Sequence, residues 1–303
     1  MSDTKKGILL SIGIMTYNHE KFVEKLLLSV LNQKVDFLYN IIVVDDASTD
    51  LTPEILKKIR NQFPEKINLI LNKQNNGALA NAKILSENNQ GKYMCFLDGD
   101  DCWTCPDKLQ KQITFLEENP DYTGCFHDAE IHSIDVSISD NQIYKNQSFI
   151  GYKSYSEFNN YTSDFYPSDL IMRNIIPTST LIFRKIDFSV FFSQFKNVTL
   201  SLNWAVHLYI IRNSKFRYFD EKWALYNDHP EGISKKHTYD KFLLSNIRIL
   251  KIYKITGLIP HCRKSINKSI ANEYINLYHF RKKTRIPLID VISFFYYRFL
   301  SVF

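Results

Sequence analysis

The feature that most constrains the fold is a regular alternation of strand and helix patterns over the first 118 residues. Four short apolar runs of strand length are each followed by a segment whose apolar residues recur with helical spacing. The strands are predicted at 9–15, 41–44, 67–71 and 93–97, and the helices at 20–31, 53–63, 77–87 and 107–118. Strands that are joined through helices run in one direction. The pattern therefore predicts βαβ units and a mostly parallel α/β sheet, covered on both faces.

Polar residues follow each of the four predicted strands. The clusters are Thr16-Tyr17-Asn18-His19, Asp45-Asp46-Ala47-Ser48, Asn75-Asn76-Gly77 and Asp98-Gly99-Asp100-Asp101. The carboxyl ends of parallel strands lie at one edge of a sheet, and ligands bind in the crevice beyond that edge. We therefore expect the four clusters to form one site.

The last cluster belongs to the stretch F-L-D-G-D-D at 96–101, which places three carboxylates over four positions at the exit of a buried strand. Like charges this close repel one another and are costly to desolvate, so either a positive partner lies beside them or this strand end is fully solvated. The chain lacks the G-x-G-x-x-G and G-x-x-x-x-G-K-[ST] phosphate-binding patterns. One interpretation is a bound Mg²⁺ or Mn²⁺ that carries a diphosphate, and the alternative is a solvated Asp-Gly turn.

Composition narrows the class of protein. The chain has 303 residues, of which 45% are hydrophobic and 23% charged, and its formal net charge is +6. The acidic residues crowd the expected cleft, and the positive charge is not concentrated on one predicted face of the sheet, so we expect no nucleic-acid partner. The five cysteines form no repeating pattern, which favours a reducing, cytoplasmic location. No apolar stretch of 18 residues without charge occurs, so no transmembrane helix is expected.

Several segments together match a known family. The two most specific are V-V-D-D-A-S-T-D at 43–50 and F-L-D-G-D-D-C-W-T-C-P-D-K-L-Q-K-Q at 96–112. The others are I-M-T-Y-N-H-E at 14–20, S-V-L-N-Q at 29–33, N-N-G-A-L-A-N-A at 75–82, N-P-D-Y-T-G-C-F-H at 119–127, D-L-I-M-R-N at 169–174, P-T-S-T-L-I-F-R-K at 177–185 and F-R-Y-F-D-E-K-W-A-L-Y-N-D-H-P-E-G-I-S at 216–234. With these segments the chain resembles a family-2 glycosyltransferase with the Rossmann-like GT-A fold, of the type that builds bacterial cell-surface polysaccharides. The resemblance covers residues 8–236.

The resemblance implies a role for each matched position. The nucleotide-binding residues would be Thr16, Tyr17, Asn18, Glu20, Asp45, Asp46, Asn76, Gly77, Asp98 and Gly99. Because Asp98-Gly99-Asp100 matches the D-x-D motif, Asp100 would hold Mn²⁺ or Mg²⁺ together with Asp98 and His229. Two alternatives stay open: Asp46 as a helix cap, and His229 as an ordinary loop histidine.

The chemistry that the resemblance implies is direct displacement at the anomeric carbon with inversion. The metal would neutralise the leaving diphosphate, and a carboxylate would take the proton of the acceptor hydroxyl. In the family that base is an aspartate in a pattern like G-D-W-P-L-H-L. Here the stretch S-L-N-W-A-V-H-L at 201–208 matches it and places Asn203 at the base position.

An amide does not accept a proton at neutral pH, so Asn203 leaves three interpretations open. The enzyme is slow or inactive, or another group such as Asp128, His127 or His207 is the base, or the acceptor is already ionised. The expected partners are a nucleotide-sugar donor, first of all a UDP-sugar, and a glycan or lipid-linked acceptor. The main alternative is a nucleotide-sugar-binding protein that has lost its catalytic base. A glycoside hydrolase would also use paired carboxylates, but it would not need the D-D-A-S-T-D cluster.

The parallel-sheet pattern stops near residue 236, which divides the chain into a catalytic domain at 1–235 and a helical region at 236–303. A basic cluster at 281–285 is followed by Pro287 and a helix that is apolar on most sides. At about 1.5 Å per residue, this helix is too short to cross a hydrocarbon core of about 30 Å. One interpretation is contact of 281–303 with an anionic membrane surface, at the inner face of the cell membrane. The alternative is a helix docked on the catalytic domain or on a second subunit of a homo-oligomer.

Overall fold

The computed structural model describes residues 7–133, 163–281 and 288–302. Its strands are β1 (Leu10–Thr16), β2 (Tyr39–Asp45), β3 (Ile67–Leu71), β4 (Tyr93–Asp98), β5 (Cys102–Trp103), β6 (Tyr122–Ser133), β7 (Asp164–Phe165), β8 (Ile182–Arg184) and β9 (Lys215–Asp228). They form one sheet in the order β3-β2-β1-β4-β8-β6-β9-β5, with β7 paired to β9. On the main path only β8 and β5 run against the other strands, so the sheet is mostly parallel, as predicted.

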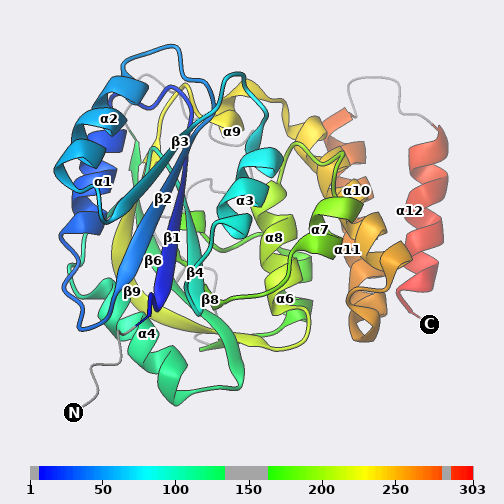
Figure 1. The fold of residues 1–303 in the computed structure, drawn as a ribbon. Coiled ribbons are helices and arrows are strands. Elements are labelled where there is room, and N and C mark those ends of the chain that lie inside the picture. Colours follow the sequence, from blue (N-terminus) through cyan, green and yellow to red (C-terminus); the bar gives the residue numbers. More distant parts are fainter. Residues whose placement is uncertain (1–6, 134–162, 282–287, 303) are drawn as a thin grey trace.

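Helices cover both faces of this sheet. They are α1 (Val23–Leu31), α2 (Thr52–Gln62), α3 (Ala78–Glu87), α4 (Lys108–Glu118), α6 (Pro167–Met172), α7 (Ser189–Gln194), α8 (Leu202–Ile211), α9 (Ile233–Lys236), α10 (Tyr239–Thr256), α11 (Arg263–Arg281) and α12 (Leu288–Leu300), with 3-10 helices at Thr178–Thr180 and Pro260–Cys262. Figure 1 shows α1 and α2 on one side of the sheet, α3, α7 and α8 on the other, and α10 to α12 stacked at the end farthest from α1.

The four predicted strands and four predicted helices of the first 118 residues are all present, with small shifts of their bounds. The largest shift is at α1, which begins at Val23 rather than at Glu20. Glu20 belongs to a loop instead. Its N–H donates to Asp50 Oδ2 at 3.1 Å, and its carboxylate accepts the N–H of Leu51 at 2.9 Å. These bonds to the loop after β2 hold the chain out of the helix.

The second half of the sheet was not assigned from the sequence. Its main feature is the long parallel pair of β6 and β9, whose register shifts at His127–Asp128 and again at Asp128–Ala129. The strand β8, of three residues, lies antiparallel between β4 and β6. Strands this short, and strands interrupted by bulges, carry little of the alternating pattern on which a prediction depends.

A separate hydrophobic core lies on each face of the sheet. In β2, Ile41 and Val43 point into one core and Ile42 and Val44 into the other. This is the arrangement expected of a parallel sheet buried on both sides. The core on the α3 face is the larger one, because α7, α8, α10 and α11 all contribute to it.

The C-terminal helices α10 and α11 pack on α8 and α6. The Tyr253 hydroxyl of α10 donates to the carbonyl of Ala205 in α8 at 2.6 Å, and Ser269 Oγ of α11 donates to the carbonyl of Ile171 at 2.8 Å. The division of the chain at 235/236 stays a prediction. Within the described residues, no helix is both long enough and apolar enough to span a membrane.

Candidate functional site

Three strand ends meet at one edge of the sheet. In the parallel register, Thr16 at the end of β1 pairs with Asp45 at the end of β2, and Met15 pairs with Asp98 at the end of β4. The polar clusters that follow these strands therefore lie side by side.

Hydrogen bonds tie the loop after β1 to the loop after β2. Asn18 has a left-handed backbone, with φ +57°, and donates its N–H to Ser48 Oγ at 2.9 Å. Its Oδ1 accepts the N–H of Thr49 at 2.8 Å. Tyr17 is 40% exposed. Asn18 and Glu20 thus fix the relation of the two loops, while the Tyr17 ring faces solvent.

Asp45 and Asp46 are buried and bind backbone N–H groups. Asp45 accepts from the Ser48 hydroxyl at 2.5 Å and from its N–H at 3.0 Å. Asp46 accepts the N–H of Asn76 at 2.8 Å and that of Gly77 at 2.9 Å. Asp46 therefore holds the loop that leads into α3, where Gly77 has φ +83°. It caps neither α2 nor α3, because neither helix has a side-chain cap hydrogen bond at its N-terminus. A contact of either carboxylate with a nucleotide stays a prediction.

Gly99 allows the end of β4 to approach the loop after β1 closely. A Cβ atom at this position would lie 2.4 Å from Nδ1 of His19 and 2.9 Å from the side chain of Thr16, which is closer than side chains tolerate. The D-x-D motif therefore needs glycine here for packing. This close approach brings His19 beside the carboxylates.

Asp100 is the meeting point of three distant segments. Its Oδ2 lies 3.0 Å from Nε2 of His229, in the loop after β9, and 3.8 Å from Nε2 of His19. His229 is buried, and its ring packs on Phe22 with 4.8 Å between ring centroids. His229 was expected here from the sequence. The contact of His19 was not, although His19 belongs to the cluster after β1.

The three carboxylates of 98–101 have very different proton affinities. Burial, and then the charge of Asp100, raises the pKa of Asp98 to about 7. Burial and the charges of Asp100 and Asp98 raise the pKa of Asp101 well above its usual range. Burial also acts to raise the pKa of Asp100, but the hydrogen bond from His229 and the charge of His19 outweigh it and lower the pKa. The negative charge of the site is thus concentrated on Asp100.

Asn203 reaches the same place from the first turn of α8. Its Nδ2 donates to Thr178 Oγ1 and lies 3.5 Å from Asp98 Oδ2. The preceding Ser201 has a left-handed backbone, with φ +54°, which turns the chain into the helix. The amide therefore occupies a position beside the D-x-D motif. Thr178, at the start of a 3-10 helix, belongs to the matched segment 177–185, but no role was assigned to it from the sequence.

The other proposed bases, His127, His207 and Asp128, are all buried. Burial, with the charge of Lys108, lowers the pKa of His127 well below its usual value, and burial alone lowers the pKa of His207 to about 3. A base this weak is poorly matched to proton abstraction near neutral pH. Asp128 is buried at the bulge of β6 and accepts the N–H of Ala129 at 2.8 Å.

The described residues contain no ready-made metal site: no group of three or more His, Cys, Asp or Glu side chains is arranged to hold an ion. The expected trio of Asp98, Asp100 and His229 is therefore only partly assembled, since Asp98 faces Asn203 instead. Asp100 and His229, however, present donor atoms 3.0 Å apart. Two neighbouring ligands of an octahedral ion have a similar separation, about 3 Å. The donor pair fits Mg²⁺ or Mn²⁺ that takes its remaining ligands from substrate phosphates.

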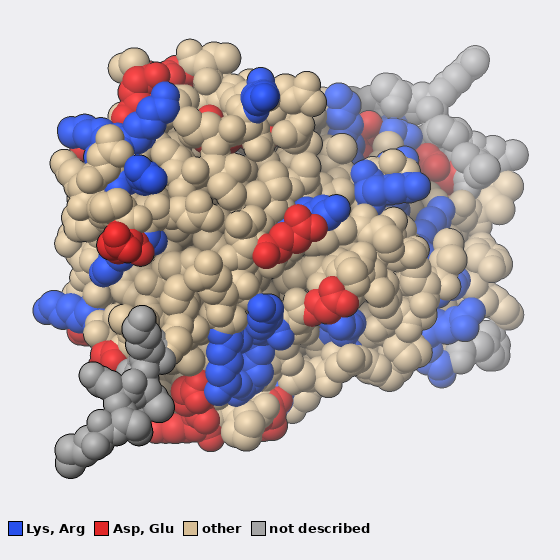
Figure 2. Space-filling view, viewed as in Figure 1, with Lys and Arg blue, Asp and Glu red and all other residues tan. Residues whose placement is uncertain are grey.

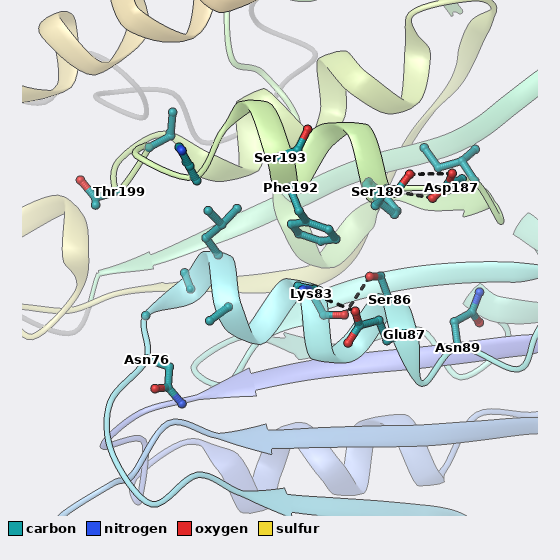
Figure 3. Close-up of a pocket in the computed structure, with 18 of the residues that line it drawn as sticks. Asn76, Lys83, Ser86, Glu87, Asn89, Asp187, Ser189, Phe192, Ser193 and Thr199 are labelled. Atoms are coloured by element: carbon teal, nitrogen blue, oxygen red, sulfur yellow. Dashed lines mark hydrogen bonds and ion pairs between the residues drawn. The ribbon is translucent and has the colours of Figure 1, made fainter.

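A groove of about 1080 Å³ runs between α3 and α7 (Figure 3). One end of the groove is formed by Asn76 and Gly77, which Asp46 holds, and by Thr199, shortly before α8. Figure 3 shows Phe192 pointing from α7 toward α3. Three lysines line the groove: Lys83, Lys185 and Lys196. The groove therefore begins beside the polar strand ends and continues along the surface.

The chain matches known proteins in both family and fold. The family model described as Glycosyl transferase family 2 matches residues 11–188. An uncharacterised protein of Mycobacterium tuberculosis is 29% identical over 226 residues, which are 74% of this chain and 60% of that protein. The chain thus spans about 60% of the length of such relatives. An uncharacterised glycosyltransferase of Haemophilus influenzae is 37% identical over 111 residues, which are 37% of this chain and 43% of that protein.

Solved structures share the fold at low sequence identity. Residues 1–349 of Staphylococcus aureus TarS in complex with UDP-GlcNAc match with a TM-score of 0.62 and 16% identity, over 96% of this chain and 79% of that one. The mannosyltransferase PcManGT of Pyrobaculum calidifontis, in complex with GDP-Man and Mn²⁺, matches with a TM-score of 0.52 and 13% identity, over 99% and 84% of the chains. The expected GT-A-type fold is thereby confirmed.

Proposed function

Since the chain belongs to glycosyl transferase family 2, we propose that it transfers a sugar from a nucleotide-diphosphate sugar to a hydroxyl group of a glycan or lipid-linked acceptor. The first candidate donor is a UDP-sugar, because the structural neighbour TarS is described with UDP and with UDP-GlcNAc. A cytoplasmic location stays part of the proposal, and the five free cysteines agree with it.

The observation that carries the proposal is the contact of Asp100 with His229. It joins the end of β4 to a loop 129 positions later in the chain, at the edge where Thr16 and Asp45 also end their strands. A half-buried ionised carboxylate with a buried imidazole beside it can bind a divalent cation together with its diphosphate. A solvated turn would have no need of the buried imidazole.

Asp100 and His229 are the residues that would hold Mn²⁺ or Mg²⁺. When bound, the ion supplies charge neutralisation at the leaving diphosphate. The chain itself contributes the rest of the arrangement. The loops fixed by Asn18 and Asp46 would position the nucleotide, and direct displacement from the opposite face of the sugar would invert the anomeric carbon.

We assign the acceptor to the groove between α3 and α7. Phe192 suits packing against the apolar face of a sugar ring. The charged side chains of the lining are three lysines and two acids, Glu87 and Asp187, which suit the hydroxyl groups of a polar acceptor. Phe192→Ala should raise the KM for the acceptor several-fold and leave donor affinity unchanged. Val190→Ala, on the same helix and outside the groove, is the matched control. An equal loss of donor affinity in Phe192→Ala would contradict this assignment.

A second candidate function is a nucleotide-sugar-binding protein without turnover. The observation that favours it is the amide of Asn203, which bonds to Thr178 and approaches Asp98 where the family has a basic carboxylate. Asn203→Asp separates the two functions. A rise in turnover of about 10²-fold or more would identify a chain that has lost its base. If turnover does not rise and the unchanged chain already turns over clearly, then another group is the base or the acceptor is already ionised.

The test of the main proposal is nucleoside diphosphate release from a panel of nucleotide sugars, with Mn²⁺ and with a chelator, in the presence of acceptor extract. Asp100→Asn should abolish release without unfolding the chain. Asp107→Asn is the matched control, because Asp107 is exposed in the loop after β5 and its side chain caps nothing. If no nucleotide sugar is consumed by the unchanged chain or by Asn203→Asp, the transferase proposal is wrong.

A further inference from the structure

The contacts of helix α12 with the other described helices come mainly from one of its faces. Phe294 and Tyr297 pack against the core, and the Tyr297 ring stacks on Tyr274 of α11, with 6.2 Å between centroids and 19° between planes. At its C-terminal end, the carbonyl of Leu300 accepts a hydrogen bond from Asn267 Nδ2 at 3.0 Å. These contacts dock α12 on α11, within the helical region 236–303 and not on the catalytic domain that the sequence interpretation named.

The opposite face of α12 exposes large apolar side chains. They are Ile292 (59% exposed), Phe295 (65%), Tyr296 (56%) and Phe299 (62%) within the helix, and Val302 (66%) in the turn that directly follows it. Their spacing of three or four residues places them on one side of the helix, away from Phe294 and Tyr297. Single exposed apolar residues are common, but five on one side of the helix and of the turn after it form a patch of the kind that marks a binding surface. We call these five residues the outer face.

Cations gather around the outer face without acidic partners. The ammonium of Lys254, at the end of α10, lies 4.6 Å from the centroid of the Tyr297 ring and 5.6 Å from that of Tyr296. Burial and the nearby charges of Arg263 and Lys251 lower the pKa of Lys254, so these cations lie close enough to repel. In the described part of the chain, neither they nor Arg298 of α12 forms an ion pair with a carboxylate. Figure 2 shows blue side chains predominating over the C-terminal helices.

The whole region is strongly positive. Residues 236–303 hold thirteen Lys or Arg and three Asp or Glu, a formal net charge of +10, in a chain whose net charge is +6. The remainder of the chain is therefore negative. An apolar face with uncompensated cations around it is complementary to a surface that is apolar inside and anionic at its rim.

We propose that the outer face of α12 docks on the surface of an anionic lipid bilayer, with the helix in the plane of the membrane. Its thirteen residues would cover about 20 Å of that surface. The phenylalanines and Ile292 would enter the acyl boundary, the tyrosine would lie at headgroup level, and Lys254, Arg263 and Arg298 would meet lipid phosphates. A second copy of the chain is a poorer occupant, because pairing two such faces would bring two regions of charge +10 together.

The experiment is co-sedimentation of the full chain with vesicles, either of phosphatidylcholine alone or with phosphatidylglycerol included. Binding should appear with the anionic vesicles and weaken as salt is raised. Phe295→Ser/Phe299→Ser should lower the partition coefficient by about ten-fold or more, because both side chains leave water on docking. The matched control is Leu38→Ser/Val190→Ser, at two exposed apolar positions outside the C-terminal helices.

Charge is tested in the same way with Lys254→Gln/Arg298→Gln, which should weaken binding several-fold, against Lys57→Gln/Arg60→Gln in α2. A Phe295→Trp chain adds a direct readout, since the three native tryptophans are buried: brominated lipid should quench the new fluorophore on binding. The proposal is overturned if anionic vesicles do not bind the unchanged chain, or if the outer-face and control variants bind alike. It is also overturned if sedimentation velocity without lipid shows a dimer that Phe295→Ser/Phe299→Ser abolishes. None of these outcomes bears on transferase activity.

Discussion

The two sides of the site differ in how completely their polar atoms are paired. On the side formed by the loops after β1 and β2, the carboxylates of Asp45 and Asp46 both accept backbone hydrogen bonds, and so does the side chain of Asn18. On the side formed by the end of β4, buried polar atoms are left over. Among the described residues, Oδ1 of Asp101 and Nδ1 of His229 have no hydrogen-bond partner.

This difference indicates what each side of the site contributes. Paired carboxylates stabilise the folded chain and hold loops in a fixed arrangement. Unpaired buried groups and like charges destabilise it, so they persist where a ligand completes them. Under the proposed function, the first side would be a prearranged frame for the nucleotide, and the second would be the place where cation and diphosphate complete the structure.

Asp46→Ala should produce the largest loss of stability. It leaves the N–H groups of Asn76 and Gly77 and the amide of Asn72 without their acceptor. We expect the free energy of unfolding to fall by about 3 kcal/mol, measured by chemical denaturation. Asp36→Ala, at an exposed position, should change it by less than about 0.5 kcal/mol. Equal effects of the two substitutions would break the comparison, because the frame would then not depend on its paired carboxylates.

Gly99→Ala should lower the stability less than Asp46→Ala does, and it should disturb both sides of the site. The added methyl group would displace His19 and Thr16, which it would meet at 2.4 and 2.9 Å. We expect a loss of about 2 kcal/mol in stability and weaker metal-dependent nucleotide binding. Gly7→Ala is the control, because a Cβ there meets nothing within 4 Å. Full nucleotide affinity in Gly99→Ala would show that the close approach of the two loops is unimportant.

Glu273 of α11 is a carboxyl group outside the site with one unpaired oxygen. It tests whether such a group only lowers the stability of the folded chain. Burial raises its pKa to about 7 from 4.5, one oxygen accepts from Asn246 at 3.2 Å, and the other has no partner among the described residues. The folded state then holds a proton that the unfolded state releases, so stability is greatest below about pH 4.5 and falls as pH rises to about 7.

Between pH 5 and pH 8, Glu273→Gln should therefore lose about 1–2 kcal/mol less unfolding free energy than the unchanged chain. Glu54→Gln, exposed on α2, should follow the unchanged chain. Denaturation curves across this pH range measure both. A pH profile that Glu273→Gln leaves unaltered would mean that the carboxyl group is not kept protonated by its surroundings.

Asp101→Asn should give the smallest effect on stability, and in the opposite direction. It removes the buried one of three adjacent carboxylates while keeping the size of the side chain. We expect the free energy of unfolding to rise by about 1 kcal/mol and catalytic turnover to fall. A loss of stability would be inconsistent with the view that this side is strained until a ligand binds. Asp107→Asn, exposed in the following loop, should leave both quantities unchanged.

The sequence was sufficient for the first half of the fold and for the edge where the site lies. Strands β1, β2 and β4 are continuous buried runs and β3 is a short apolar run, with helices between them, so their bounds follow from periodicity. That their carboxyl ends share one edge follows from the parallel connections, whereas the pairing of Asp45 with Thr16 and of Asp98 with Met15 comes from the structure.

The rest depends on contacts between residues far apart in the chain. His19 approaches Asp100 only because Gly99 lacks a side chain, and Thr178 meets Asn203 only because a 3-10 helix and the start of α8 are brought together. Asp46 holds the loop before α3, thirty positions later, and does not cap the helix that follows it. Neither the spacing nor the type of these residues predicts such contacts. The basic cluster and Pro287 of the predicted tail lie largely outside the described residues.

The most direct test of the account is calorimetric titration of nucleoside diphosphates (UDP, GDP and dTDP) into the unchanged chain and into Asp100→Asn, each with Mn²⁺ and with chelator. The account predicts that one nucleotide binds the unchanged chain with Mn²⁺ and binds at least ten-fold more weakly with chelator. Asp100→Asn with Mn²⁺ should then resemble the unchanged chain with chelator. Binding that is equal in all four conditions, or absent from all of them, would contradict the claim that Asp100 and His229 complete a cation and diphosphate site.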